Sequence, residues 1–183
     1  MKQSILLFLI FVLSIGVADA QKYFTRSGKV SFFSDAPLEE IEAKNTSATS
    51  VLDTQSGRVE FAILIKAFQF KKALMQEHFN ENYMESSKYP KATFKGQIIN
   101  ANEINFSKDG EYPAKVKGTL TIRGKSQETE TDGTISVQAG QISATSSFEV
   151  AIADYDISVP SVVRDNIADI VRIDVNVNYE PLK

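Results

Sequence analysis

The stretch "KVKGTLTIRG", from Lys115 to Gly124, decides the fold. Apolar or small residues alternate strictly with polar ones, so that one face carries Val116, Gly118, Leu120 and Ile122. Successive side chains of a β-strand point to opposite faces of the sheet, and this period of two therefore predicts a half-buried strand. The Arg-Gly pair that ends the stretch is typical of a tight turn. The stretch predicts one strand of an antiparallel sheet, apolar on one face and wet on the other.

The same alternation recurs on both sides of this stretch. Residues on one face are Val59, Phe61, Ile63 and Ile65 in "GRVEFAILIK", Ala92, Phe94, Gly96 and Ile98 in "ATFKGQII", then alternate residues over 142–152 and 171–179. Turn signals at 53–57, 108–111 and 138–141 separate these runs. Regular short strands with tight turns predict an all-β meander that is closed into a barrel or folded into a sandwich. No linker or repeat divides it, which favours a single domain.

Residues 70–82 break the pattern. Lys, Ala, Leu, Met, Gln and Glu, which favour helices, cluster there, and Leu74, Met75, His78 and Phe79 fall on one side of a helix. The segment predicts a short helix between two strands that caps the barrel. Tyr89-Pro90 marks its exit, because a residue before proline is disfavoured in the helical conformation.

The chain opens with a positive Lys2, an apolar run over 5–17 and the small-residue pattern Ala18-Asp19-Ala20. This arrangement predicts a signal peptide over 1–20 and a mature domain over 21–183 that is exported to the periplasm or the extracellular space. The apolar run is shorter than the roughly 20 residues of a membrane-spanning helix. The protein is therefore not expected to be an integral membrane protein.

Composition excludes several classes of function. The formal net charge is −3 and the sequence has no basic cluster, so nucleic acid is not an expected partner. The chain contains no cysteine, which excludes disulfides, thiol nucleophiles and zinc–thiolate sites.

Candidate catalytic groups are sparse. His78 is the single histidine of the chain, and a general base or metal ligand built on it lacks a second histidine, so a packing role is favoured. Glu128, Glu130 and Asp132 share one strand face, which is usually the solvated side of a barrel. No catalytic residue, metal site or cofactor is predicted. A small-substrate hydrolase or isomerase that uses His78 is the enzymatic alternative.

The apolar strand faces leave two readings open. They can fill a solid core, giving an envelope protein that acts through its surface, or they can line a barrel that holds one small ligand. Small residues on the same faces would leave room for a ligand: Gly96, Gly118, Ala144 and Ser146.

Two motifs add a resemblance. "EHFNENYMESSKYPKATFKG", with Phe79 and the Lys88-Tyr89-Pro90 strand entry, and "VKGTLTIRGKSQE", with Arg123-Gly124, resemble the signatures of the YceI-like family. The resemblance implies an antiparallel, lipocalin-like β-barrel of about eight strands with a short helix. It also implies non-enzymatic binding of a polyisoprenoid or similar long-chain lipid, as a carrier or storage protein of the bacterial cell envelope.

If the resemblance holds for function, the apolar strand faces are expected to contact a ligand. The expected apolar lining from the strands is Phe61, Ile63, Phe94, Leu120, Ile122, Phe148 and Val150, with Leu74, Met75 and Phe79 of the helix as a wall or lid. No cofactor is expected other than a bound isoprenoid or fatty-acyl lipid. A homodimer is left open.

Overall fold

The computed structural model describes residues 22–182. The predicted signal peptide, residues 1–20, lies outside the described residues. The strands are β1 (Lys22–Asp35), β2 (Glu40–Asp53), β3 (Arg58–Leu64), β4 (Gln69–Phe70), β5 (Lys91–Ile98), β6 (Gly110–Ile122), β7 (Lys125–Gln138), β8 (Gln141–Ala151) and β9 (Ile170–Pro181). Short helices are η1 (Ile65–Ala67), α1 (Ala73–His78), η2 (Phe79–Tyr83), η3 (Ala101–Glu103), η4 (Ile152–Tyr155) and η5 (Ser161–Asn166).

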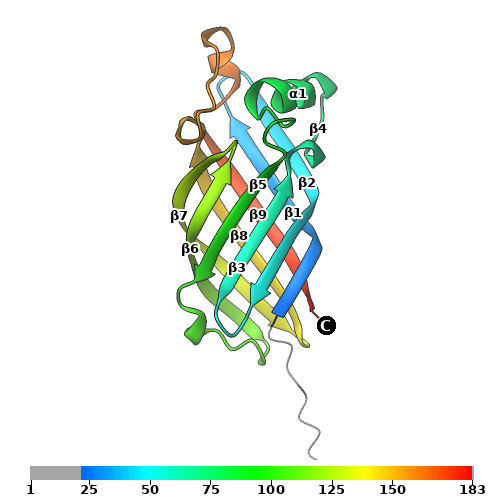
Figure 1. Cartoon of the computed structure of the whole chain (residues 1–183), viewed down its shortest axis with the longest axis vertical. Helices are drawn as coiled ribbons and strands as arrows, with labels where there is room; N and C mark the ends of the chain where they lie inside the picture. The colour runs from blue at the N-terminus through cyan, green and yellow to red at the C-terminus, as the bar shows by residue number, and fades with distance from the viewer. Residues whose placement is uncertain (1–21, 183) are drawn as a thin grey trace, which may run out of the picture.

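The strands form a closed barrel (Figure 1). Their order is β1-β9-β8-β7-β6-β5-β3-β2, and β1 also pairs with β2, which closes the ring, while the two-residue β4 adds to β2. All the pairings are antiparallel. The prediction of an all-β antiparallel barrel of about eight strands is therefore confirmed, and the sandwich alternative is wrong.

Two-residue turns join the long hairpins. Arg123 and Gly124 (φ 49° and 75°) connect β6 to β7, and Ala139 and Gly140 (φ 49° and 76°) connect β7 to β8. Two successive positive φ angles are the mark of a type I′ turn, whose twist matches that of antiparallel strands. The turns predicted at these positions are confirmed.

The hairpin of β1 and β2 was not evident from the sequence. Many of its buried positions are small or polar, namely Thr25, Gly28, Ala43, Ala48 and Ser50. Such residues give no apolar alternation, although the strands are among the longest in the barrel.

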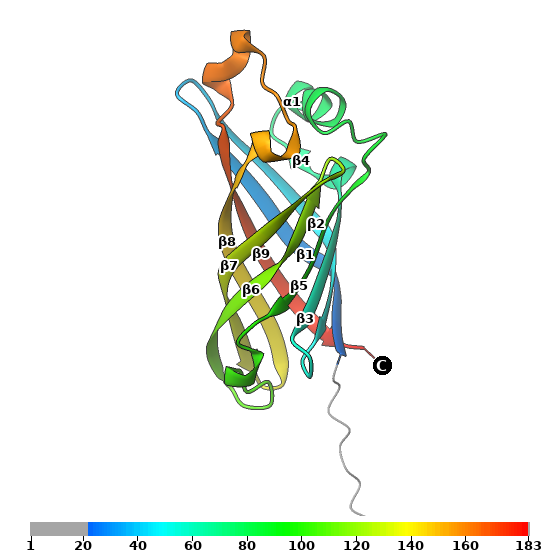
Figure 2. The ribbon, with the colours of Figure 1, turned by 60° about the vertical axis from the view of Figure 1, so that its left-hand side comes forward.

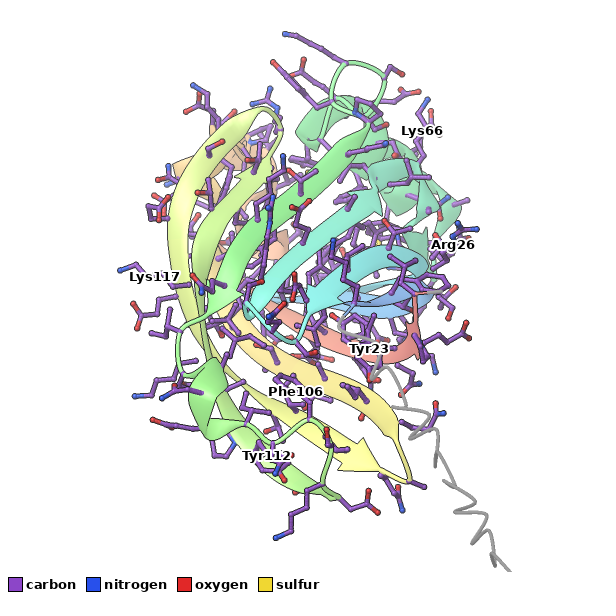
Figure 3. All side chains as sticks on the ribbon, turned by 60° about the horizontal axis from the view of Figure 1, so that its bottom comes forward. Tyr23, Arg26, Lys66, Phe106, Tyr112 and Lys117 are labelled. Atoms are coloured by element: carbon purple, nitrogen blue, oxygen red, sulfur yellow. The ribbon has the colours of Figure 1, made fainter. Side chains whose placement is uncertain are left out.

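One end of the barrel is closed by packing. A buried cluster there includes Leu52, Ile104, Val137 and Ile142, against which Tyr23, Phe106 and Tyr112 pack (Figure 3). Both ends of the described chain lie at this end, where the Leu182 N–H donates to the Lys22 carbonyl at 2.8 Å (Figure 1).

The opposite end carries α1, η2, η4 and η5 (Figures 1 and 2). The helix predicted over 70–82 is present as α1, which continues into a single π-helical turn, η2. Turns of this kind often occur at functional sites. No helix in the described part of the chain has the length and apolar character needed to cross a bilayer.

The ladder between β7 and β8 is incomplete. It runs from the turn to Gly133 and Ser146 and then stops, although β7 still pairs with β6 to Lys125 and β8 still pairs with β9 to Ala151. Figure 2 shows the two strands separating toward the end that carries η4. We call this separation the β7–β8 seam.

Candidate ligand-binding cavity

A cavity of about 500 Å³ lies between the end that is closed by packing and the opposite, open end, which carries α1, η2, η4 and η5. Its wall is overwhelmingly apolar and receives side chains from all eight long strands. All but one of the residues expected to form the lining are found in it. They are Phe61, Ile63, Met75, Phe79, Phe94, Leu120, Ile122, Phe148 and Val150. Strand parity read from the sequence therefore placed the strand residues of this set inside the barrel, and helical spacing placed Met75 and Phe79 there. The hollow interior also argues against the solid-cored reading.

Leu74 is the exception. It is 61% exposed and lies outside the lining, whereas its neighbour Met75 lies within it. Consecutive helical residues are about 100° apart around the axis, and Leu74 lies on the side of α1 that faces away from the cavity. Leu74 is thus an outer residue of the lid, contrary to the expectation from the sequence.

Four phenylalanines form the wall beneath the lid. The Phe79 ring stacks on Phe32 at 5.3 Å between centroids and lies 5.0 Å from Phe70 and 5.8 Å from Phe68. Such pairs contribute about 0.5–1.5 kcal/mol each beyond their buried area. Phe79 therefore anchors η2 to β1, β4 and the segment before β4. The sequence interpretation found Phe79 but missed Phe32, Phe68 and Phe70, because "SFF" and "AFQF" do not extend into a regular alternation.

Gly96 and Gly118 do not enlarge the cavity as the sequence suggested. They face each other across β5 and β6, and a Cβ on either would lie within 2.8 Å of the Phe94 ring. The aromatic ring therefore covers the space that the two missing side chains leave. The glycines therefore let Phe94 lie flat on the barrel wall.

Charged groups are confined to a few positions in the wall. Among the described lining residues the acidic or basic side chains are Glu39 and His78, with no lysine or arginine. Glu39 belongs to the β1–β2 loop and His78 to α1, so both come from the open end, which we call the mouth. Within residues 22–182 no group of three or more histidines and carboxylates is placed to hold a metal ion.

Two of the tyrosines in the wall, Tyr155 and Tyr179, are buried. Tyr179 is 2% exposed and its hydroxyl lies 2.8 Å from that of Ser50, and burial raises the pKa of Tyr179 to about 12. Burial also raises the pKa of Tyr155, which hydrogen-bonds Thr129. Both phenols are therefore neutral at physiological pH and serve as packing groups with one hydrogen bond each.

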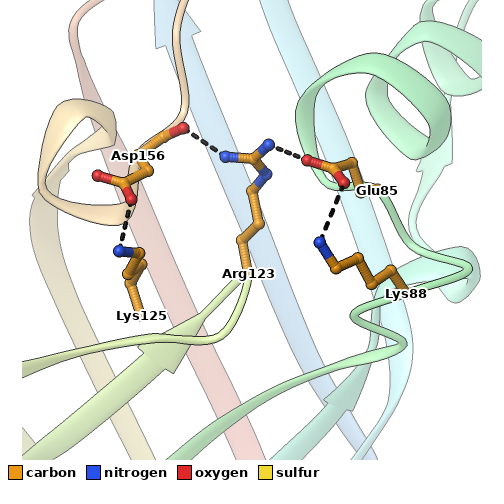
Figure 4. A network of polar contacts seen from close by, with 5 residues as sticks. All are labelled: Glu85, Lys88, Arg123, Lys125 and Asp156. Atoms are coloured by element: carbon orange, nitrogen blue, oxygen red, sulfur yellow. Dashed lines mark hydrogen bonds and ion pairs between the residues drawn. The ribbon is translucent and has the colours of Figure 1, made fainter.

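A polar network connects the elements around the mouth (Figure 4). We call its central residues, Glu85, Arg123 and Asp156, the clasp. The Arg123 guanidinium donates to the Glu85 carboxylate after η2 and to the Asp156 carbonyl after η4. Lys125 Nζ lies 2.6 Å from the Asp156 carboxylate, and this contact lowers the pKa of Asp156. One arginine in the β6–β7 turn thus connects both segments that cover the barrel.

The clasp residues share an unusual backbone conformation. Glu85, Arg123 and Asp156 have φ angles of 45°, 49° and 56°. The left-handed region costs a non-glycine residue roughly 1–2 kcal/mol. The surrounding contacts must hold these three residues in place, and such local strain is typical of functional elements.

The two motifs that carried the family resemblance meet beside this clasp. The Tyr89 ring packs on Gly124, where a Cβ would come within 2.7 Å of the ring, and the Pro90 carbonyl accepts from the Ile65 N–H at 3.0 Å. The Lys-Tyr-Pro entry and the Arg-Gly turn are therefore one structural unit.

The comparisons with known proteins agree with this architecture. A family model described as the YceI-like domain matches residues 16–179. No match was found among curated proteins.

Several solved structures share the fold. A polyisoprenoid binding domain from Saccharophagus degradans, implicated in plant cell wall breakdown, has a TM-score of 0.77 at 14% identity and covers 89% of this chain and 99% of its own. BcnA of Burkholderia cenocepacia has a TM-score of 0.67 at 19% identity, over 84% of this chain and 96% of its own. A YceI protein of Campylobacter jejuni has a TM-score of 0.58 at 18% identity, over 75% and 84%.

Proposed function

The chain belongs to the YceI-like family, and we propose that its barrel binds a polyisoprenoid or similar long-chain lipid without catalysing a reaction. The hollow apolar interior is the observation that carries this proposal. The similar domain from Saccharophagus degradans, described as polyisoprenoid-binding, supports the choice of ligand class.

The energetics of such a site are favourable. Each buried methylene group contributes about 0.8 kcal/mol, so an isoprene unit contributes several kcal/mol. A few units offset an association cost of roughly 4 to 15 kcal/mol. Binding therefore needs no charged or catalytic group in the wall, and chains of similar girth should bind with similar affinity.

The enzymatic alternative rests on His78. Although His78 lines the cavity, the described lining gives it no second histidine and no metal-binding cluster to work with. Replacement of His78 by glutamine should leave lipid retention unchanged. Loss of a measurable hydrolase or isomerase activity in this variant would instead favour the enzyme.

The proposal extends to the place of action. A signal peptide over residues 1–20 would deliver the barrel to the bacterial cell envelope, where it acts as a carrier or store of its lipid. Fractionation of cells, with N-terminal sequencing of the mature protein, tests this. A first residue of Gln21 in the periplasmic or extracellular fraction is expected, and a chain retained in the cytoplasm would contradict it. Light scattering of the same sample tests the homodimer.

Mass spectrometry of organic extracts from the natively purified protein tests the binding function. A long-chain apolar lipid in amounts comparable to the protein is expected. The Ile63→Trp variant, which narrows the cavity, supplies the control, because adventitious lipid on the surface would be retained by both. Repeated absence of lipid, together with failure to take up added polyprenols, would overturn the proposal.

A further inference from the structure

A pair of hydroxyl groups lies in the cavity wall where the β7–β8 ladder stops. Oγ1 of Thr131 and Oγ of Ser146 are 3.2 Å apart, and both residues line the cavity. The Ser146 hydroxyl donates to the Asp132 carbonyl at 2.7 Å. Neither hydroxyl belongs to the mouth, since both come from the middle of long strands.

Side chains hold the seam together beyond this pair. The Gln127 amide donates to the Asp154 carbonyl at 2.8 Å, and Thr129 hydrogen-bonds Tyr155. Among the lining residues, Thr129, Thr131, Ser146 and Tyr155 therefore bring hydroxyl groups to this strip of the wall. A wall with no need for polar recognition would be expected to continue its ladder and to point apolar side chains inward, as β5 and β6 do.

The Thr131–Ser146 pair has bonding capacity to spare. A hydroxyl has one hydrogen to donate and two lone pairs to accept with. The Ser146 hydroxyl donates to the Asp132 carbonyl, and the Thr131 hydroxyl donates to the same carbonyl at 3.2 Å, which leaves acceptor lone pairs on both oxygens. The pair can therefore accept a hydrogen bond from an alcohol without giving up a contact of its own.

The charge of the wall limits which polar group can reach this pair. With no lysine or arginine in the described lining, an ionised phosphate or carboxylate would lose its hydration shell and gain no cation in return. Such a group belongs outside the mouth. An uncharged oxygen function pays a much smaller desolvation cost, which one or two hydrogen bonds offset.

We propose that Thr131 and Ser146 determine ligand specificity by accepting a hydrogen bond from an uncharged alcohol group carried by the apolar chain. This inference rests on the proposed lipid binding and narrows its ligand class to neutral oxygenated chains.

Displacement of the fluorescent apolar probe N-phenyl-1-naphthylamine from the delipidated protein tests the inference. Hexadecan-1-ol and hexadecane are compared as competitors, because they share one chain and differ by a hydroxyl. The wild-type protein should bind the alcohol about fivefold more tightly, the scale of one neutral hydrogen bond. The Thr131→Val/Ser146→Ala variant should lose this preference and bind the alkane at least as tightly as before.

Two further variants separate recognition from folding. Thr131→Ser keeps the hydroxyl and should keep the preference, and Thr145→Val removes a hydroxyl from the exposed face of β8 and should also keep it. Thr131→Val alone decides the matter if the double variant does not fold, since valine is close to threonine in shape. The inference would be overturned if the folded valine variant kept the preference for hexadecan-1-ol over hexadecane, or if the wild-type protein lacked it. Either result would leave the proposed lipid binding intact. Failure of both competitors to displace the probe would overturn the proposed function as well.

Discussion

The Tyr179 and Ser50 hydroxyls, 2.8 Å apart, join β9 to β2 across the barrel interior. Both residues are buried, so either hydroxyl would have no partner after removal of the other. Tyr179→Phe should lower the free energy of unfolding by about 1–2 kcal/mol, measured by urea denaturation at pH 7. The control is Tyr112→Phe. The Tyr112 hydroxyl donates to the Lys108 carbonyl at an exposed position, so its loss should lower the free energy of unfolding less. Equal effects of the two variants would contradict the prediction.

The same tyrosine predicts a loss of stability in alkali. Its pKa is about 12 in the folded protein, against about 10 when unfolded. Below pH 10 the hydroxyl is protonated in the folded and unfolded states, so its contribution to the free energy of unfolding is complete. Between about pH 10 and 12 only the unfolded state releases the proton. The free energy of unfolding of wild type should therefore fall by about 1.4 kcal/mol per pH unit relative to Tyr179→Phe. Parallel pH profiles of the two proteins would refute this assignment.

Two neighbouring residues on β3 provide a test of the cavity. Ile63 lines it, whereas Leu64 is 48% exposed on the other face. Ile63→Trp should fill part of the hollow and weaken lipid uptake about tenfold or more, while Leu64→Trp should leave uptake near wild type. Uptake measured by probe fluorescence, with circular dichroism to verify folding, distinguishes the two. Equal uptake by both variants would place the ligand elsewhere.

The glycine pair predicts a cost of overpacking. A Cβ on Gly118 would lie 2.4 Å from both the Gly96 Cα and the Lys95 carbonyl oxygen. Gly118→Ala should therefore lower the free energy of unfolding by about 2–3 kcal/mol in chemical denaturation. Gly110→Ala on the same strand is the control, because its Cβ would meet the flexible Tyr112 side chain. A Gly118→Ala protein as stable as this control would show that the strands can separate without cost.

The clasp should govern ligand exchange. Arg123→Ala removes the donor that connects Glu85 to Asp156, so the lid segment over α1 and η2 should exchange its amide hydrogens faster, and a bound lipid should dissociate several-fold faster. Hydrogen exchange and stopped-flow fluorescence measure the two effects. Lys88→Ala, which removes an exposed contact of 4.0 Å to Glu85, should change little. Unaltered dissociation in Arg123→Ala would assign the clasp to stability alone.

The sequence predicted the barrel where alternation was strong. β3, β5, β6, β8 and β9 carry several large apolar residues on one face, and this parity placed residues such as Phe61 and Leu120 in the wall. β1 and β2 were not predicted because their buried positions include Ala43, Ala48 and Ser50. Small side chains give no periodic hydrophobic signal.

The site itself was less accessible to prediction from sequence. The clasp joins Glu85, Arg123 and Asp156, which are far apart in the chain and are brought together by the barrel. The β7–β8 seam was equally invisible, because Thr131 and Ser146 read as ordinary strand residues until the end of the ladder is known. Long-range pairing determines both features, whereas local pattern determines only which face a side chain takes.

Both ends of the described chain emerge beside each other at the closed end, opposite the mouth. A tether or fusion partner attached at either end therefore points away from the route of ligand exchange. Immobilised through such a tether, every molecule would present its mouth to the solution in one orientation. With the lipid binding proposed above, a barrel held in this way would report on apolar molecules in solution without redesign of its fold.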